Sequence, residues 1–381
     1  MQIPNTIEQS FKVDYNYKLH FTTNLFDSSN SLLADILKSY NAENKVKILF
    51  VIDEGVYKAH PLLENQIENY CELNNSTIEL KAILVVPGGE QVKVGDKHLN
   101  KVLQGINDFN ICRHSFVAVI GGGAVIDMVG YACAIAHRGV KLLRIPTTVL
   151  SQNDSAVGVK NSVNYFGKKN FLGTFALPYA IINDNAFLET LEQRDWVSGI
   201  SEAIKVALIK DKSFYNEIVE QASKLKNRDV QSMQYLIYKC ALLHMEHISK
   251  GGDPFENGSS RPLDFGHWAA HKMEHMTNYS VRHGEAVALG MAIDVTYAKL
   301  IGLIDEATLQ SVLQVIKQVG FNLKLPIPKQ DVDELLNGIE EFREHLGGKL
   351  TITLISEIGK KHDVHDIDTL KMKEAVLAFY K

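Results

Sequence analysis

The sequence predicts an α/β domain followed by an all-α domain. In the first half of the 381-residue chain, short apolar runs rich in β-branched residues alternate with stretches of helical periodicity. Such alternation is typical of a mostly parallel sheet covered by helices. After Leu188 the strand-like runs nearly vanish and helical periodicity takes over. We therefore divide the chain into an N-terminal domain of residues 1–185 and a C-terminal domain of residues 186–381.

In the N-terminal domain, one amphipathic helix and four buried strands stand out. The helix is predicted over Asp96–Phe109, where apolar residues recur at three- and four-residue spacing from Leu99 to Ile106. The strands are predicted at Lys47–Ile52, Ile83–Val86, Phe116–Ile120 and Leu142–Ile145.

The C-terminal half is predicted to be helical almost throughout. One late apolar run, Leu350–Ile355, could be a strand that returns to a sheet, and the Gly- and Pro-rich stretch Lys250–Arg261 is predicted to be a loop. The predicted helices are Trp196–Ile209, Phe214–Leu225, Val230–Ile248, His267–Met276, Glu285–Leu300 and Ala307–Val319.

Composition excludes several classes of function. The net charge of −5 removes the overall electrostatic case for binding nucleic acid or an anionic membrane, although a local basic pocket for a small anion is compatible with it. No run approaches the roughly 20 apolar residues of a membrane span, and the first residues do not have the pattern of a signal peptide. The four cysteines form no CxxC pair, which is typical of reduced thiols. We expect a cytoplasmic protein.

Glycines follow two of the predicted strands. Gly121, Gly122 and Gly123 come directly after Phe116–Ile120 and precede a helix that contains Asp127. Glycines at such a turn let backbone N–H groups approach a pyrophosphate, and the helix N-terminus favours the anion. A triple glycine alone is equally compatible with a tight strand-to-helix turn.

Two other strand ends strengthen the prediction of a nucleotide site. Gly88 and Gly89 follow Ile83–Val86, with Glu90 and Lys93 next along the chain. Asp53 ends the strand Lys47–Ile52, where a carboxylate could hydrogen-bond ribose hydroxyls. Because the carboxyl ends of parallel strands meet at one edge, these residues predict a dinucleotide site in the N-terminal domain. The glycine spacing differs from the usual GxGxxG.

Histidines concentrate in the C-terminal half and predict a metal site. Six of the 14 histidines fall between His244 and His283. His267 and His271 are four residues apart, on one face of a helix. Two histidines and a carboxylate form an open catalytic zinc site of the His₂Glu kind. The carboxylate could be Glu202 or Glu285, and we interpret His244, His247 and His275 as structural.

Lysines predict a cationic pocket within an otherwise acidic protein. Lys160, Lys168 and Lys169 lie in turn-rich segments, where cationic side chains suit a substrate phosphate. Lys205 follows Glu202 by three residues on an otherwise apolar helix. Any one of the first three lysines could equally be a solvated surface residue.

Several longer motifs follow one another along the chain: GGGAVIDMVGYACA, HRG, IPTTVLSQNDSAVGVKNSVNYFGKKNFLGTF, SEAIKVALI, LDFGHWAAHKME and RHGEAVALGMA. In this order they resemble the motifs of a known superfamily, the sugar phosphate cyclases, which includes 3-dehydroquinate synthase. The resemblance runs from about residue 45 to residue 360.

The resemblance implies an NAD-binding α/β domain, a helical C-terminal domain and a homodimer. It implies that zinc, or cobalt in its place, is held by Glu202, His267 and His283, and that His271 is an active-site group rather than a ligand. With Lys205 and Asp154, His271 forms the implied catalytic set. The implied substrate-binding residues are Lys160, Lys169, Asn170, Arg261 and Asp264. The implied NAD-binding residues are Asp53, Gly88, Gly89, Glu90, Lys93, Gly121, Gly122, Gly123, Asp127, Thr147 and Thr148.

The sequence also departs from 3-dehydroquinate synthases. Asp264 replaces the asparagine of their LNFGH motif, Arg261 is shifted by one position, and a lysine expected upstream has only Lys250 as a weak counterpart. The stretches GGDPFE, RPLDFGHWAAHK and EFREHLGG are similar instead to the sedoheptulose 7-phosphate cyclases of the valiolone synthase type. This resemblance implies a lyase that eliminates phosphate from a seven-carbon sugar phosphate and closes a carbocycle.

Three alternatives stay open on sequence alone. A 3-dehydroquinate synthase of the shikimate pathway would share most motifs. A metal-dependent alcohol dehydrogenase of the glycerol dehydrogenase type would share the fold, but the lysines near Lys160 and Lys169 argue against it because a simple polyol needs no phosphate pocket. A catalytically inactive binding protein is disfavoured by the complete set Glu202, His267, His283 and Lys205.

Overall fold

The structure, a computed structural model, describes residues 6–252, 254–255 and 262–380. Its N-terminal part is built on a six-stranded sheet with the strand order β1-β8-β5-β4-β2-β3. Every neighbouring pair in this sheet is parallel. The strands are β1 (Lys18–Thr22), β2 (Val46–Asp53), β3 (Ile78–Val86), β4 (Phe116–Gly121), β5 (Lys141–Pro146) and β8 (Ala180–Asp184).

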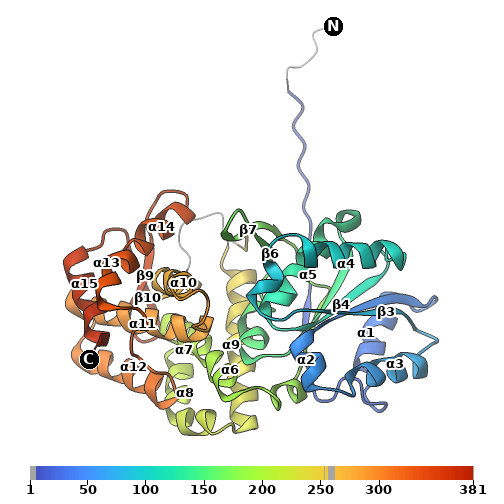
Figure 1. The fold of residues 1–381 in the computed structure, drawn as a ribbon, viewed down its shortest axis with the longest axis horizontal. Helices are drawn as coiled ribbons and strands as arrows, with labels where there is room; N and C mark the ends of the chain where they lie inside the picture. The colour runs from blue at the N-terminus through green and yellow to red at the C-terminus, as the bar shows by residue number, and fades with distance from the viewer. Residues whose placement is uncertain (1–5, 253, 256–261, 381) are drawn as a thin grey trace.

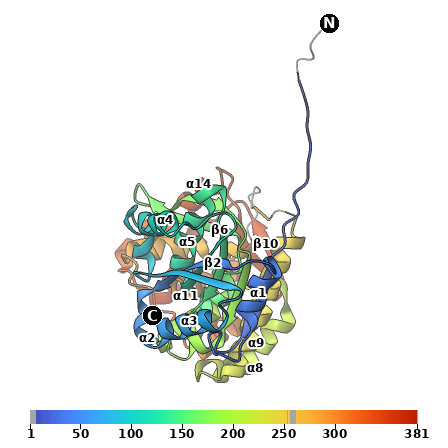
Figure 2. The same ribbon diagram turned by 90° about the vertical axis from the view of Figure 1, so that its right-hand side faces the viewer.

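Alternation of side chains along β2 divides the apolar residues between the two faces of the sheet. Phe50 and Ile52 pack with helices α1 and α3 on one face, whereas Leu49 and Val51 pack with α4 and α5 on the other. Figures 1 and 2 show the sheet between these helix layers. The helices are α1 (Leu32–Tyr40), α2 (Glu54–Ala59), α3 (Leu63–Leu73), α4 (Lys97–Asp108) and α5 (Gly123–Ile135).

The four predicted strands and the predicted helix of this domain are confirmed as β2, β3, β4, β5 and α4. The sequence analysis missed β1, β8 and an antiparallel hairpin of β6 (Lys160–Tyr165) and β7 (Lys168–Phe175). This hairpin packs on α5. Lys160, Lys169 and Asn170 all lie on this hairpin. The last strand of the parallel sheet ends at Asp184, and the domain division at residue 185 stays a prediction.

The C-terminal part is helical, as predicted. The helices, at the left of Figure 1, enclose one large apolar core around α7 and α11, which are buried along most of their length. They are α6 (Gln193–Ser198), α7 (Ile200–Lys210), α8 (Lys212–Lys226), α9 (Val230–Lys250), α10 (His267–Met276), α11 (His283–Leu300), α12 (Glu306–Gln318), α13 (Val332–Leu336), α14 (Gly338–His345) and α15 (Thr369–Leu377).

Two details of this half differ from the sequence prediction. The stretch Trp196–Ile209 forms two helices, because the chain bends at Gly199, where a Cβ atom would lie 2.4 Å from the backbone nitrogen of Leu150. The run Leu350–Ile355 contributes to β9 (Ile352–Glu357), which pairs with β10 (Lys360–Val364) and does not join the parallel sheet. Within the described part of the chain, no helix is both long and apolar enough to cross a bilayer.

Candidate functional site

The predicted glycine cradle lies at the carboxyl edge of the parallel sheet, where β2, β3 and β4 end. Gly122 caps the N-terminus of α5, and Gly123 is the first residue of that helix. A Cβ atom on Gly88 would lie 2.4 Å from Asp53 Oδ1, and one on Gly121 would lie 3.0 Å from Asp53 Cβ. The two glycines therefore let the ends of β3 and β4 close over Asp53, whose carboxylate also interacts with the backbone N–H of Gly122. The other N–H groups in the first turn of α5 have no partner within the helix, and such a helix start suits an anion.

Asp53 already makes a capping hydrogen bond within the protein. Its Oδ1 accepts a hydrogen bond from the backbone N–H of Gly55 at 2.7 Å, which caps α2. Burial raises the pKa of this carboxyl, and the surrounding N–H groups oppose that rise. Its predicted contact with a ribose stays a prediction. Thr147 and Thr148 follow β5 at the same edge of the sheet, and their contact with NAD stays a prediction.

A buried lysine joins the cradle to the β6–β7 hairpin. Lys93 is only 2% exposed, and its Nζ donates to Asp127 Oδ2 at 2.8 Å, Ser162 Oγ at 3.0 Å and Asn170 Oδ1 at 2.5 Å. The Lys93 ammonium is thus surrounded by three hydrogen-bond acceptors. Glu90, also predicted here, accepts instead from Asn164 Nδ2 at 2.9 Å. The structure brings these predicted residues together through contacts within the protein.

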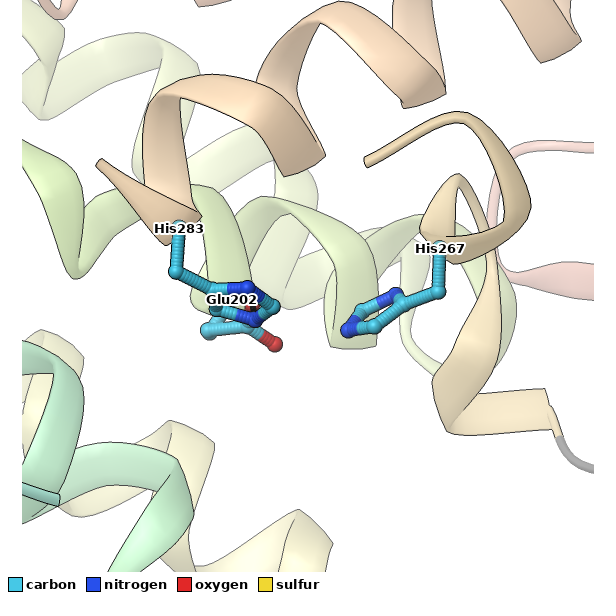
Figure 3. A group of neighbouring side chains, drawn as sticks. All are labelled: Glu202, His267 and His283. Atoms are coloured by element: carbon cyan, nitrogen blue, oxygen red, sulfur yellow. Dashed lines mark ion pairs between the residues drawn. The ribbon is translucent and has the colours of Figure 1, made fainter. Parts of the chain in front are cut away.

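Three helices bring the predicted metal ligands together. Glu202 comes from α7, His267 is the first residue of α10, and His283 is the first residue of α11. One ligand atom from each lies within 4.8 Å of the ligand atoms of the other two. Figure 3 shows the two imidazole rings turned toward the Glu202 carboxylate. Glu285, the other carboxylate that the sequence allowed, points to Arg194 instead, with Nε–Oε1 at 2.5 Å.

The Glu202 carboxylate fits a cation. Its side chain is fully buried. Lys205 forms an ion pair with Oε2, whereas Oε1 has no hydrogen-bond partner within the described residues. Burial raises the pKa of Glu202, with the Lys205 ammonium opposing it. A buried carboxylate oxygen without a partner is costly unless a further charge is brought to it. One carboxylate and two imidazoles are the donor set of an open zinc site.

Both histidines use Nδ1 within the protein and leave Nε2 for the centre of the cluster. His267 Nδ1 lies 3.1 Å from the carbonyl oxygen of Phe265, and His283 Nδ1 lies 3.1 Å from Glu274 Oε2. His283 Nε2 faces Glu202 Oε1 at 3.8 Å. Such contacts fix the tautomer and the ring orientation of metal-binding histidines.

Glu274 was missed by the sequence analysis, yet it links the cluster to the hairpin. Besides His283, it contacts Lys169 Nζ at 3.2 Å. Burial by itself would lower the pKa of Lys169, but the neighbouring Glu274 carboxylate outweighs it. The pKa is raised as a result, so this lysine stays cationic. The ring of His271 lies beside His283, with centroids 6.0 Å apart. Burial and the Lys169 ammonium lower the pKa of His271.

Asp154 lies in a short helical turn, Ser151–Ser155, at the junction of the two halves. His244 Nδ1 from α9 is 3.1 Å from its Oδ1, a contact compatible with the interpretation of His244 as structural. Burial works to raise the pKa of Asp154, but Lys205 and His244 hold it low. Buried Arg144 secures this turn by donating to the carbonyl oxygens of Ala156 and Gly158.

The remaining predicted substrate residues divide into three cases. Asp264 is partly buried and ends a short turn, Pro262–Asp264, three residues before the predicted ligand His267. Lys160 is exposed at the start of β6. Arg261 lies outside the described residues.

The chain is similar to known proteins along most of its length. Residues 83–198 match the family model of the 3-dehydroquinate synthase N-terminal domain, and residues 199–343 match that of its C-terminal domain. The chain belongs to the 3-dehydroquinate synthase family. A 3-dehydroquinate synthase of Shewanella sp. (strain MR-4) is 32% identical over 357 residues, which cover 92% of this chain and 94% of the relative.

Solved structures of the superfamily have the same fold. The 2-epi-5-epi-valiolone synthase of Streptomyces hygroscopicus subsp. jinggangensis 5008, with NAD⁺ and Zn²⁺ bound, matches with a TM-score of 0.87 at 26% identity, over 98% of this chain and 99% of that one. A 2-deoxy-scyllo-inosose synthase complexed with carbaglucose-6-phosphate, NAD⁺ and Co²⁺ matches with a TM-score of 0.77 at 20% identity, over 94% and 95%. The resemblance to the sugar phosphate cyclases is confirmed.

Proposed function

We propose that the protein is an NAD- and zinc-dependent cyclase that acts on sedoheptulose 7-phosphate. Two findings support the cofactors: the carboxylate of Glu202 and the rings of His267 and His283 suit a metal, and the solved valiolone synthase holds NAD⁺ and Zn²⁺. When bound, NAD would accept a hydride from the substrate and return it, and zinc would polarise the oxygen of the oxidised carbon. In the net reaction, phosphate leaves and a new carbon–carbon bond closes the ring.

The chain's own residues would position the substrate and move its protons. Lys169, kept cationic by Glu274, and Lys160 stand on the hairpin, where they suit a phosphate group. His271 has a lowered pKa, so its ring is neutral and can accept a proton from the substrate. Lys205 is buried between Glu202 and Asp154, whose charges hold its pKa high although burial opposes them. It would donate a hydrogen bond to a substrate oxygen.

The observation that carries the choice of substrate is Asp264, an aspartate three residues before His267 where 3-dehydroquinate synthases have an asparagine. Two like charges about 4 Å apart repel by roughly 4 kcal/mol at an effective dielectric constant near 20, which is about three orders of magnitude in affinity. A substrate carboxylate beside Asp264 would be disfavoured by that order. The hydroxymethyl terminus of sedoheptulose 7-phosphate could instead donate hydrogen bonds to the aspartate.

The second candidate is a 3-dehydroquinate synthase, because relatives at 32% identity bear that name. Phosphate release from sedoheptulose 7-phosphate and from the seven-carbon acid phosphate of the shikimate route separates the two. We expect kcat/KM to favour the sugar phosphate by about a thousandfold, and we expect Asp264→Asn to narrow that ratio. Asp366→Asn, which removes an exposed charge between β10 and α15, is the control and should leave the ratio unchanged. A wild-type preference for the acid phosphate would make the chain a divergent dehydroquinate synthase.

The homodimer implied by the resemblance stays a proposal. Sedimentation velocity at micromolar concentration is expected to give the mass of two chains. A boundary at the mass of one chain would contradict it.

A further inference from the structure

The two helices that carry the histidine ligands touch through their backbones. A Cβ atom on Gly290 of α11 would lie 2.0 Å from the carbonyl oxygen of Gly266, and a Cβ on Gly266 would lie 2.7 Å from the backbone nitrogen of Met291. Only glycine fits on either side. Gly266, which directly precedes His267, also has a φ of 79°, a conformation that favours glycine. The start of α10 is therefore held against the middle of α11.

One buried carboxyl lies next to this crossing and belongs to neither the metal cluster nor the predicted substrate pocket. Asp294 of α11 is 0% exposed. Its Oδ2 accepts the backbone N–H of Gly266 at 3.0 Å, and its Oδ1 accepts the indole N–H of Trp268 at 2.9 Å. Gly266 and Trp268 are the residues on either side of His267. The two oxygens of one side chain thus hold both neighbours of the ligand.

We propose that Asp294 is a positioning residue that fixes the direction in which His267 presents Nε2 to the metal. The proposal rests on the metal site proposed above. With Gly266 and Trp268 held, the backbone of His267 cannot rotate freely, and its Nδ1 contact with the carbonyl oxygen of Phe265 fixes the ring. Asp294 reaches the metal only through His267, and it contacts no proposed ligand side chain itself.

The chemistry of Asp294 supports a role beyond packing. Burial raises its pKa to about 7, against the opposing effect of its two N–H donors. An apolar side chain of similar size would avoid that penalty, but it could not accept from the two donors. A carboxyl group can accept at both oxygens, whereas an amide offers one acceptor and one donor group. Asparagine at this position would therefore release Gly266 or Trp268.

The test measures zinc affinity in metal-free protein by competition with a chromophoric chelator, with and without substitution. Asp294→Asn is expected to weaken zinc binding by about 10- to 100-fold, the effect usual for partners of metal ligands. Trp268→Phe keeps an aromatic ring, although a smaller one, and removes the N–H donor; we expect a loss of about three- to tenfold, since one of two contacts remains. The visible spectrum of the Co²⁺ form should shift in both variants.

Trp196→Phe is the matched control. The indole N–H of Trp196 is also buried and donates to the carbonyl oxygen of Leu225 at 2.8 Å, at the contact between α6 and α8. It should cost a similar stability without changing zinc affinity. Circular dichroism and denaturant unfolding establish that each variant is folded. If Asp294→Asn does not fold, Trp268→Phe decides the question.

Zinc affinities within twofold of wild type in the folded variants would overturn the proposal, as would an equal loss in Trp196→Phe. Failure of the underlying metal site is recognised separately. In that case, wild-type protein would bind no zinc, or Glu202→Gln would bind it as tightly as wild type.

Discussion

The two sides of the candidate site differ in whether their buried charged groups have all their hydrogen-bond partners within the protein. At the sheet edge, the buried ammonium of Lys93 is surrounded by acceptors from Asp127, Ser162 and Asn170. At the helical side, the buried carboxylate of Glu202 pairs with Lys205 through Oε2, but within the described residues Oε1 has no hydrogen-bond partner and faces His283 Nε2 at 3.8 Å. The Lys93 ammonium thus has its partners without a ligand, whereas Oε1 of Glu202 gains a close partner only when a cation is bound. Ligand removal should therefore affect the two sides unequally.

The largest expected effect is the linkage of stability to zinc. A ligand that binds only the folded state at a free concentration 1,000 times its Kd stabilises that state by about 4 kcal/mol. We expect a gain of this size when zinc is added to the metal-free protein, and we expect Glu202→Gln to abolish it. Denaturant unfolding with buffered zinc measures both.

Glu285→Gln provides the control for this prediction. Glu285 also lies in the C-terminal half, but its carboxylate is bound to Arg194. The zinc-dependent gain should persist in this variant. Loss of the gain in Glu285→Gln but not in Glu202→Gln would reverse the assignment of the carboxylate.

The second effect concerns the sheet edge, where stability should depend on internal pairing. Removing one partner of a buried ion pair costs about 3–5 kcal/mol. Because Asp127 is partly exposed, we expect Lys93→Met to cost about 3 kcal/mol, the lower end of that range. The zinc-dependent gain should be unchanged. Chemical denaturation of the metal-free and zinc-bound forms tests both statements.

A surface ion pair gives the comparison for this substitution. Lys58 pairs with Glu54 at 2.6 Å, with side chains 70% and 47% exposed. Lys58→Met should cost no more than about 0.5 kcal/mol, as is usual for exposed pairs at this helical spacing. Equal costs for Lys58→Met and Lys93→Met would show that the buried network contributes nothing special.

The same contrast explains what could be predicted from the sequence. Strands β2, β4 and β5 were found because they are short, continuous apolar runs buried on both faces. Of the edge strand β3, only the apolar end Ile83–Val86 was predicted. The β6–β7 hairpin was missed because its residues are polar or exposed and its pairing is antiparallel. The break at Gly199 was missed because it depends on a close approach to Leu150, which no local pattern reveals.

For the site, residue patterns alone indicated a metal but left Glu202 and Glu285 open, and the resemblance to a family favoured Glu202. Glu274 and Asp294 were not found, and His244 was interpreted as structural. Each of these residues contacts a partner that is close in space but not adjacent in the chain: Glu274 contacts Lys169, Asp294 contacts Trp268, and His244 contacts Asp154. Sequence spacing therefore carries no signal for these contacts. A carboxylate in a largely buried helix, such as Asp294, is a sequence signal that could have been used.

The smallest expected effect tests the cradle without disturbing the fold. The nearest atom to a Cβ on Gly122 would be Thr148 Cγ2 at 3.6 Å, an ordinary contact, so Gly122→Ala should leave the free energy of unfolding nearly unchanged. If the N-terminus of α5 receives the pyrophosphate of NAD, the added methyl group should weaken NAD binding about tenfold, or about 1.4 kcal/mol. Calorimetric titration with NAD⁺ measures this change in affinity.

Gly158→Ala, whose Cβ would be 3.9 Å from the nearest atom, is the control outside the cradle and should bind NAD as wild type does. Unaltered affinity in Gly122→Ala would move the nucleotide away from this helix, and the sheet edge would then be a structural network rather than a binding site.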